Sequence, residues 1–478
     1  MKKKNKIELL APAGSPEKMD YAFTYGADAV YMGIPDFSLR VRINKFELGD
    51  VKKAIEHAHQ WGKKVYVTAN IYAHNEHLKK LPSYLKKLNT WKPDALIISD
   101  PGVMQMAKQY APDIPIHVST QANVTNWQAV KFWADQGAER VILGREVTLE
   151  EIKEIHKRVP KVELEYFVHG AMCMSYSGRC MLSAWLTGRS ANLGDCVQPC
   201  RWKYDVRTHS GSILTNTPSG SPLLGGEPIE VEVEEPKKPG MKIPVEEDRH
   251  GTYIFNSKDM CFIEYLDELI DAGIVSLKIE GRAKSVAYLA CVIKAYREGI
   301  DYIVHVGAGS SNMADKLDLP ARKKYLRKLK KKYLDKLMHR GYTTGFLFGP
   351  DKVEQQTEVS HLDSKEEFVG EVIRIGNVET HCMRLRDHHH TVNKIKKIYI
   401  RPHNALKMGD KIRVIQPNKN ETESQKQAKN ETEFQFSLPQ IYAETGEKVD
   451  SAHGGTGQLV YILSKRDIRP YSVLMRVK

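Results

Sequence analysis

Eight short apolar runs, each followed by a segment of helical periodicity, constrain the fold of this 478-residue chain more than any other feature. The runs occupy residues 7–11, 29–33, 64–70, 95–100, 116–123, 140–146, 162–170 and 275–282. Continuous apolar runs of this length are typical of strands that are buried on both faces of a parallel sheet. Residues 51–59, 127–135 and 149–158 show the period of amphipathic helices between them. The alternation predicts repeated βα units.

Eight such units favour a sheet that closes into a (β/α)8 TIM-like barrel. An open, doubly wound parallel sheet is the structural alternative. Most of the runs end in polar residues, and a barrel gathers its reactive groups where its strands end. We therefore expect an α/β fold with a catalytic barrel over residues 1–305.

The repeat of βα units is interrupted once, between the seventh and eighth runs, where residues 171–255 form an insertion. An interruption of this size within a compact domain is usually functional. The first part of the insertion carries four of the seven cysteines. The second part, residues 210–244, is rich in Gly, Pro, Ser and Glu and is expected to be loosely folded.

A strongly basic helix is predicted over residues 319–340, within a linker of residues 306–365. Residues 316–340 contain eleven Lys and Arg against two Asp, which makes +9 of the formal +13 of the chain. A run of cationic residues often only faces solvent, but this large excess of positive over negative residues favours contacts with the phosphates of a polyanion. The apolar positions that recur at helical spacing are Leu326, Leu329, Tyr333 and Leu337.

Residues 366–478 show strand patterns without helices, separated by turns that contain Gly, and they predict a small β-barrel domain that we expect to bind RNA. The sequence KNETE occurs twice in the polar stretch 418–433, which we expect to be a hairpin loop. No stretch approaches the roughly 18 apolar residues that span a bilayer, and no export signal is recognised. We therefore expect a cytoplasmic protein without a membrane partner.

Four cysteines lie close together in the sequence with the spacing C-x6-C-x15-C-x3-C: Cys173, Cys180, Cys196 and Cys200. A reducing compartment argues against a disulfide framework. Four thiolates can hold a [4Fe-4S] cluster or a tetrahedral zinc ion, and the absence of C-x2-C pairs favours the cluster. Reduced cysteines that pack as small apolar side chains are the alternative, which suits Cys261, Cys291 and Cys382 better.

The stretch EYFVHGAMCMSYSGRCMLS, residues 165–183, resembles the signature of the collagenase-like peptidase family. Further blocks, including SLRVR at 38–42, SLKIEGR at 276–282 and HRGYTTGF at 339–346, resemble the branch of that family that hydroxylates tRNA. The resemblance implies prephenate-dependent hydroxylation of the wobble uridine of tRNA to 5-hydroxyuridine. It also implies a [4Fe-4S] cluster on the four clustered cysteines, prephenate as co-substrate and tRNA as partner.

Prephenate is a dicarboxylate, so its site needs paired cations. The candidates at or beyond strand ends are Arg42, Arg145, Lys278 and Arg282. The alternative is that such cations form salt bridges with nearby acids. The candidate catalytic residues are His169, Glu146 and Glu280, of which His169 would donate or accept a proton or would only hold the cysteine loop.

Three further polar residues, Asn70, Gln121 and Asn123, follow the third and fifth runs and could read the edge of a uracil base. Polar strand ends whose groups are satisfied within the protein are the commoner explanation.

Other functions have to be weighed against tRNA hydroxylation. A peptidase is suggested by the family's name, yet the sequence contains neither H-E-x-x-H nor G-x-S-x-G. Hydroxylation of rRNA or participation in quinone hydroxylation would use the same family scaffold. A non-catalytic RNA-binding module would use the basic helix and the C-terminal domain alone.

Overall fold

The structure is a computed structural model. It describes residues 7–34, 37–38, 46–173, 176–177, 180–187, 189, 196–197, 199–201, 231–234, 242–248, 251–253, 257–309, 319–349, 362–378, 395–418, 432–455 and 457–478.

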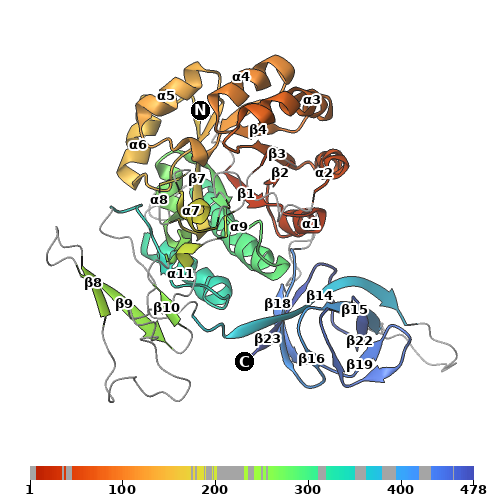
Figure 1. Cartoon of the computed structure of the whole chain (residues 1–478). Helices are drawn as coiled ribbons and strands as arrows, with labels where there is room; N and C mark the ends of the chain where they lie inside the picture. Colours follow the sequence, from red (N-terminus) through yellow and green to blue (C-terminus); the bar gives the residue numbers. More distant parts are fainter. Residues whose placement is uncertain are drawn as a thin grey trace, which may run out of the picture.

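Eight parallel strands close into a barrel, which confirms the predicted (β/α)8 fold (Figure 1). They are β1 (Glu8–Pro12), β2 (Ala29–Gly33), β3 (Lys64–Ala69), β4 (Ala95–Ile98), β5 (Ile116–Val118), β6 (Arg140–Ile142), β7 (Glu163–Ala171) and β12 (Ile274–Ile279). Successive strands pair from β1 to β7, and β12 closes the barrel because it pairs in parallel with both β7 and β1.

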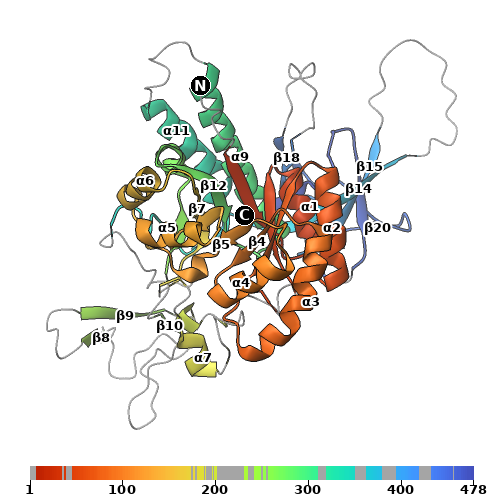
Figure 2. The same cartoon turned by 90° about the horizontal axis from the view of Figure 1, so that it is seen from above.

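Helices surround the strands, as Figure 2 shows from above. They are α1 (Pro16–Thr24), α2 (Leu48–Gln60), α3 (Asn75–Trp91), α4 (Pro101–Tyr110), α5 (Trp127–Asp135), α6 (Leu149–Arg158), α8 (Leu266–Asp271) and α9 (Val286–Gly309). Side-chain caps start several of them, for example Asn126 on α5 and Thr148 on α6. None of the described helices is long and apolar enough to cross a membrane.

The insertion between β7 and β12 forms several small elements. They are α7 (Leu182–Thr187), the 3-10 turn η4 (Pro199–Arg201), β8 (Val231–Glu234), β9 (Lys242–Asp248), β10 (Gly251–Tyr253), β11 (Asp259–Cys261) and the 3-10 turn η5 (Ile263–Tyr265). Strands β8, β9 and β10 make an antiparallel sheet, whereas β11 pairs with the end of β7. The predicted loose segment 210–244 lies mostly outside the described residues, but β8 and the first residues of β9 belong to it.

Buried ion pairs cross the interior of the barrel. Arg140 of β6 donates hydrogen bonds to Glu8 at 2.6 Å, to Glu163 at 2.7 Å and to Glu165 at 3.1 Å. Lys278 of β12 donates to the second oxygen of Glu165 at 2.7 Å. Burial opposes the charge of Arg140, but Glu165 and Glu8 outweigh it and raise the guanidinium pKa above its ordinary value. The pairs therefore connect β1, β6, β7 and β12 through the centre of the barrel.

The basic segment forms α11 (Leu319–Leu329) and a π-helical turn, η6 (Lys330–Leu334). Its apolar face is buried as predicted, because Leu326, Leu329 and Tyr333 are almost inaccessible to solvent. Strand β13 (Tyr342–Thr343) follows and pairs with β11. The first strand of the C-terminal domain begins at Glu366.

The C-terminal domain is an antiparallel sheet, as the strand pattern predicted, and Figure 1 shows it curled around its own core. Its strands are β14 (Glu366–Asn377), β15 (Lys396–Pro402), β16 (Leu406–Lys407), β17 (Lys411–Ile415), β18 (Glu433–Ser437), β19 (Ile441–Ala443), β20 (Lys448–Val449), β21 (Ser451–Ala452), β22 (Val460–Ser464) and β23 (Val473–Val477). The pairing of β17 with β18 confirms a hairpin around the KNETE stretch, most of which lies outside the described residues.

The barrel and the C-terminal domain share a continuous packed interface. Ile415 and Val473 of the C-terminal domain belong to the apolar core of the barrel. The Tyr25 hydroxyl of α1 donates to the Ile415 carbonyl at 2.8 Å. Lys294 of α9 donates to the Gln416 carbonyl at 3.0 Å, and burial lowers its pKa to about 8. The position of the C-terminal domain is therefore set by both apolar and polar contacts.

We predict that Arg140→Met destabilises the fold by about 3–5 kcal/mol, because removal of one partner leaves buried carboxylates without a counter-charge. Arg158→Met is the matched control, since Arg158 pairs with Glu154 on the surface, where both side chains are 50% exposed. Its expected cost is about 0–1 kcal/mol. Urea unfolding followed by circular dichroism measures both. Equal midpoints for the two variants would contradict a structural role for the interior ion pairs.

Candidate active site at the carboxyl end of the barrel

Buried polar atoms without hydrogen-bond partners gather on the loops that follow β5 and β6. Gln121 lies in the 3-10 turn η2 (Thr120–Ala122), and Asn123 follows in the left-handed region with φ of 52°. Arg145 and Glu146 lie just beyond β6, which pairs with β5. The unpartnered atoms are Gln121 Oε1, Asn123 Nδ2, Arg145 Nε and Glu146 Oε2. Such atoms at the carboxyl ends of barrel strands are typical of a ligand site.

Arg145 is held between an acid and an aromatic ring. Its guanidinium lies 3.5 Å from the Glu280 carboxylate, and its central carbon lies 4.1 Å from the centre of the Phe167 ring. Only 11% of the Arg145 side chain and 12% of the Glu280 side chain are exposed. The contact therefore orients the guanidinium while Nε keeps an unused donor.

The other predicted cations occupy different positions. The Lys278 ammonium group is buried against Glu165, and it also lies 4.5 Å from the centre of the Tyr31 ring. Burial lowers the Lys278 pKa, whereas Glu165 opposes that shift. Arg282 is buried beyond β12, with its guanidinium carbon 5.9 Å from the same ring. Arg42 lies outside the described residues.

Glu146 joins the cysteine segment to the barrel. Its Oε1 accepts a short hydrogen bond from the backbone N–H of Ser177, which lies between Cys173 and Cys180 in the sequence. The other carboxylate oxygen, Oε2, is buried without a partner. The structure thus places this predicted catalytic residue where it holds the cysteine segment at the end of β6.

The four clustered cysteines lie on neighbouring pieces of the insertion. Cys173 lies two residues after the end of β7, Cys180 precedes α7, and Cys200 lies in η4, which packs against α7. The backbone N–H of Val197, next to Cys196, donates to Ser183 Oγ of α7 at 3.2 Å. Cys173 and Cys196 are exposed, the other two are partly buried, and the six cysteines that the structure describes form no disulfide.

Four thiols fit a [4Fe-4S] cluster in donor chemistry. In the described part of the chain, however, no three His, Cys, Asp or Glu side chains are placed so that they could hold a metal ion. A cluster would therefore have to draw the four cysteines together as it binds.

His169 is turned away from the barrel interior by a β-bulge. Phe167 pairs with Lys278, but the next pair is His169 with Ile279, so Val168 is an extra residue on β7. The His169 ring packs 5.5–5.9 Å from the ring centres of three tyrosines. These are Tyr288, Tyr296 and Tyr342. Complete burial lowers the His169 pKa to about 3, so the imidazole is neutral near pH 7.

Comparison with known proteins decides the family. The model of Peptidase family U32 matches residues 14–357, which is most of the chain and the barrel from α1 onward. The chain belongs to peptidase family U32. The matched residues include the four clustered cysteines and the polar loops beyond β5 and β6.

Similar proteins match this U32 family member from end to end. The tRNA hydroxylation protein P of Haemophilus influenzae is 37% identical, over 98% of this chain and 96% of that protein. The protein of the same name from Escherichia coli is 38% identical, over 98% of this chain and 97% of that protein. The tRNA hydroxylation protein P1 of Bacillus subtilis is 33% identical, over 99% and 95% respectively.

Sequence reasoning about this U32 family member missed two aromatic residues at the site. Phe167 and Tyr31 offer their ring faces to Arg145 and Lys278, respectively. Both lie on strands that the apolar runs predict as buried, β2 for Tyr31 and β7 for Phe167. For Phe167 the available signal is the alternation along β7, which places it on the same face as Glu165, but alternation does not say which interior residues lie near the mouth.

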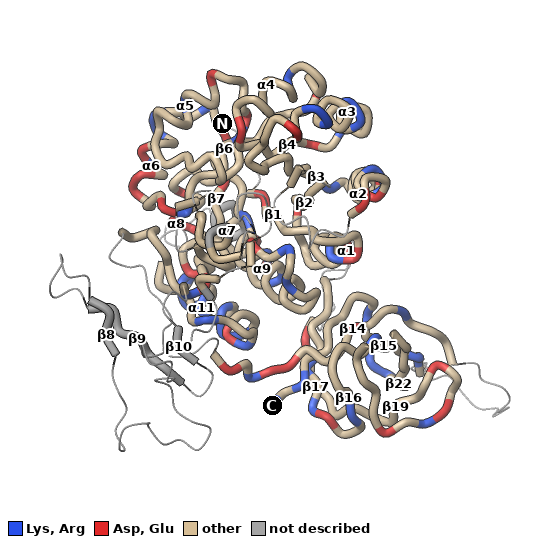
Figure 3. Tube along the Cα trace, in the orientation of Figure 1, with Lys and Arg blue, Asp and Glu red and all other residues tan. Residues whose placement is uncertain are grey.

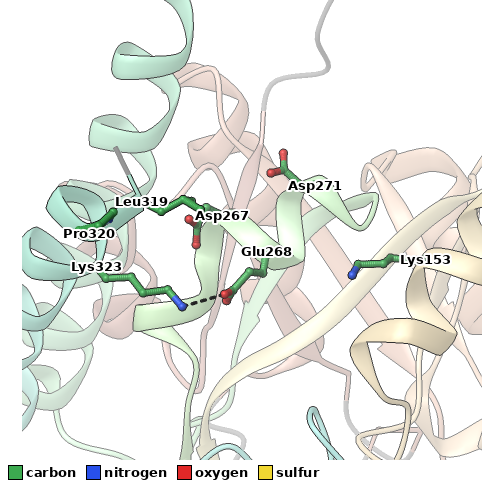
Figure 4. Close-up of a pocket in the computed structure, with 7 residues that line it drawn as sticks. All are labelled: Lys153, Asp267, Glu268, Asp271, Leu319, Pro320 and Lys323. Atoms are coloured by element: carbon green, nitrogen blue, oxygen red, sulfur yellow. Dashed lines mark hydrogen bonds and ion pairs between the residues drawn. The ribbon is translucent and has the colours of Figure 1, made fainter. Parts of the chain in front are cut away.

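A hollow of about 450 Å³ lies elsewhere, between α6, α8 and the first turn of α11 (Figure 4). Acidic residues of α8 line it, and Glu268 pairs there with Lys323 at 3.0 Å. None of the candidate site residues lines this hollow. It belongs to the outer helical layer of the U32 barrel.

Proposed function

We propose that this U32 family member hydroxylates the wobble uridine of tRNA to 5-hydroxyuridine, with prephenate as co-substrate and a [4Fe-4S] cluster. The observation that carries the proposal is the end-to-end similarity, at 37–38% identity, to relatives named for tRNA hydroxylation. The mouth of the barrel supports it, because buried polar atoms without partners lie there beside the cysteine segment.

The proposed reaction replaces the C5–H bond of uracil with C5–OH. With oxygen at the level of water, this change releases two electrons and two protons from the base, so it needs an electron acceptor beyond the side chains of the protein. Cys173, Cys180, Cys196 and Cys200 would hold the [4Fe-4S] cluster, which would supply one-electron redox chemistry. Glu146 would position the cysteine segment through its hydrogen bond from the Ser177 backbone.

Arg145 is the proposed main contact for prephenate, and Arg282 is the proposed second cation. A carboxylate that reaches the mouth would find the unused Nε donor of Arg145, which Glu280 and Phe167 hold in place. A preorganised guanidinium binds a carboxylate with little loss of side-chain freedom. Lys278 contributes less to the proposed site, because Glu165 already compensates its charge.

His169 and Glu280 take supporting roles in the proposal. A neutral imidazole behind the barrel wall can keep the end of β7 in place, since the Tyr296 hydroxyl lies 3.4 Å from its Nδ1 and donates to the Val168 carbonyl at 2.7 Å. Glu280 orients Arg145.

The proposed tRNA-binding surface includes the exposed side of α11 and η6, where Lys and Arg recur in Figure 3. Lys323 pairs with Glu268 at 3.0 Å and Lys332 pairs with Glu433 at 3.1 Å, so these two lysines anchor the segment to the protein. By contrast, the exposed lysines for which no described residue forms an ion pair are Lys324, Lys328 and Lys331. These three are the proposed phosphate contacts.

We predict that Cys196→Ala abolishes both the cluster and the modification, because three thiolates cannot hold the cluster stably. Cells that lack the gene would be complemented with either form, and their tRNA nucleosides measured by mass spectrometry. Iron, sulfide and visible absorbance of the anaerobically purified protein give a second readout. Cys382→Ala is the control and should match the parent. Full iron content in Cys196→Ala protein would refute the assignment of the cysteines.

We predict that Arg145→Lys raises the prephenate concentration needed for half-maximal rate by about tenfold, because lysine lacks the planar fork of arginine. Iron content should stay unchanged. Arg158→Lys, on the exposed end of α6, is the matched control and should have no effect. An unchanged prephenate requirement in Arg145→Lys protein would remove Arg145 from the co-substrate site.

We predict that replacing Lys324, Lys328 and Lys331 together with glutamine weakens tRNA binding. Log affinity falls as log salt concentration rises, and each lost phosphate contact should make this slope shallower by about 0.9. The control replaces the ion-paired Lys323 and Lys332 with glutamine and should leave that slope unchanged. Fluorescence anisotropy with labelled tRNA at several salt concentrations measures both. The same slope for parent and triple variant would mean that tRNA docks on another face.

A further inference from the structure

We infer that Gln121 and Asn123 form the reading site for the Watson–Crick edge of the target uracil. The inference rests on the proposed function, since it names how that site would choose its base. It depends on a separate observation, which is that both carboxamides carry a buried atom without a partner.

The backbone that carries the two carboxamides is firmly held. Asn123 ends η2, and its N–H donates to the Thr120 carbonyl at 3.0 Å. The Thr120 hydroxyl donates to the Leu143 carbonyl at 3.1 Å, which ties η2 to the end of β6. Ser119, at the start of η2, accepts a hydrogen bond from Asn70 at 3.1 Å. The loop is therefore preorganised before any ligand arrives.

Asn123 also adopts a backbone conformation that few residues other than glycine accept, with φ of 52°. Asparagine tolerates this region better than most side chains. A left-handed residue at the end of a barrel strand, with a buried and unused side-chain donor, fits a functional constraint better than a packing role.

The two free atoms have complementary character. Asn123 Nδ2 is a donor, whereas Gln121 Oε1 is an acceptor. Uracil presents the carbonyl O4 as an acceptor and N3–H as a donor on the same edge. Cytosine presents the reverse at these positions, an amino donor and an unprotonated N3. In the orientation that the structure shows, the pair matches uracil. Cytosine would place its amino donor against Asn123 Nδ2 and its N3 acceptor against Gln121 Oε1.

The position of the pair agrees with this role. RNA-modifying enzymes must take the target base out of its stack and read its edge in a pocket. The η2 turn lies beside the loop of Arg145 and Glu146, because β5 and β6 are neighbours in the barrel. A base whose edge meets η2 would therefore lie next to the proposed co-substrate contact and the cysteine segment.

The test uses anticodon stem-loop RNAs with uridine, cytidine or 3-methyluridine at the wobble position, with the iron-loaded full-length protein. The parent should modify uridine and not 3-methyluridine, because the methyl group removes the N3–H donor. Asn123→Asp should lower the uridine rate by about tenfold to a hundredfold, since a donor becomes an acceptor. The uridine-to-cytidine ratio of this variant should fall as well.

Gln121→Met keeps the length of the side chain but removes the acceptor, and a comparable loss is expected. Asn126→Asp is the matched control in the same loop, because its side chain only caps α5 and a carboxylate caps equally well. Unchanged rates and base ratios in the Asn123 and Gln121 variants, beside active parent protein, would overturn the inference.

Binding of the same RNAs, measured by anisotropy, separates this inference from the proposed chemistry. If the parent fails to hydroxylate but prefers uridine over 3-methyluridine, and Asn123→Asp loses that preference, the reading site stands and the proposed reaction fails. If the parent binds all three RNAs equally and hydroxylates none, both ideas fall.

Discussion

The ion pairs buried inside the barrel are the constraint on which the rest of the structure depends. Arg140, Glu8 and Glu165 come from three different strands, and charges removed from water are tolerated only when each has a partner. The register of these strands is therefore restricted by charge as well as by backbone pairing. Because the strands are held in register, the polar loops at their carboxyl ends meet in one place.

The same network shapes the electrostatics of the mouth. Glu165 compensates Lys278, so this lysine adds little net charge where a substrate would arrive. Arg145, held by Glu280 and Phe167, keeps an unused donor there instead. A barrel mouth with oriented cations and carboxamides, next to a cysteine segment tied down by Glu146, suits an anionic co-substrate and a single extruded base.

The C-terminal domain and the basic segment extend this arrangement beyond the barrel. The apolar contacts of Ile415 and the buried Lys294 hold the domain against α9 and α1. Lysines of η6 bridge to the domain, as the pair of Lys332 with Glu433 shows. A large RNA could then contact a rigid two-part surface while one nucleotide enters the mouth.

Periodicity and spacing are local properties of the chain, so they were enough to predict the barrel, the C-terminal strand domain and the insertion that carries the four clustered cysteines. The tertiary structure alone decided which side chains have partners. A one-residue bulge moves His169 out of the barrel interior. Lys278 forms an ion pair with Glu165, and Lys323 forms one with Glu268. No local pattern contains these facts, because packing decides which residue far along the chain becomes a hydrogen-bond or ion-pair partner. Packing also leaves atoms of Gln121 and Asn123 without partners.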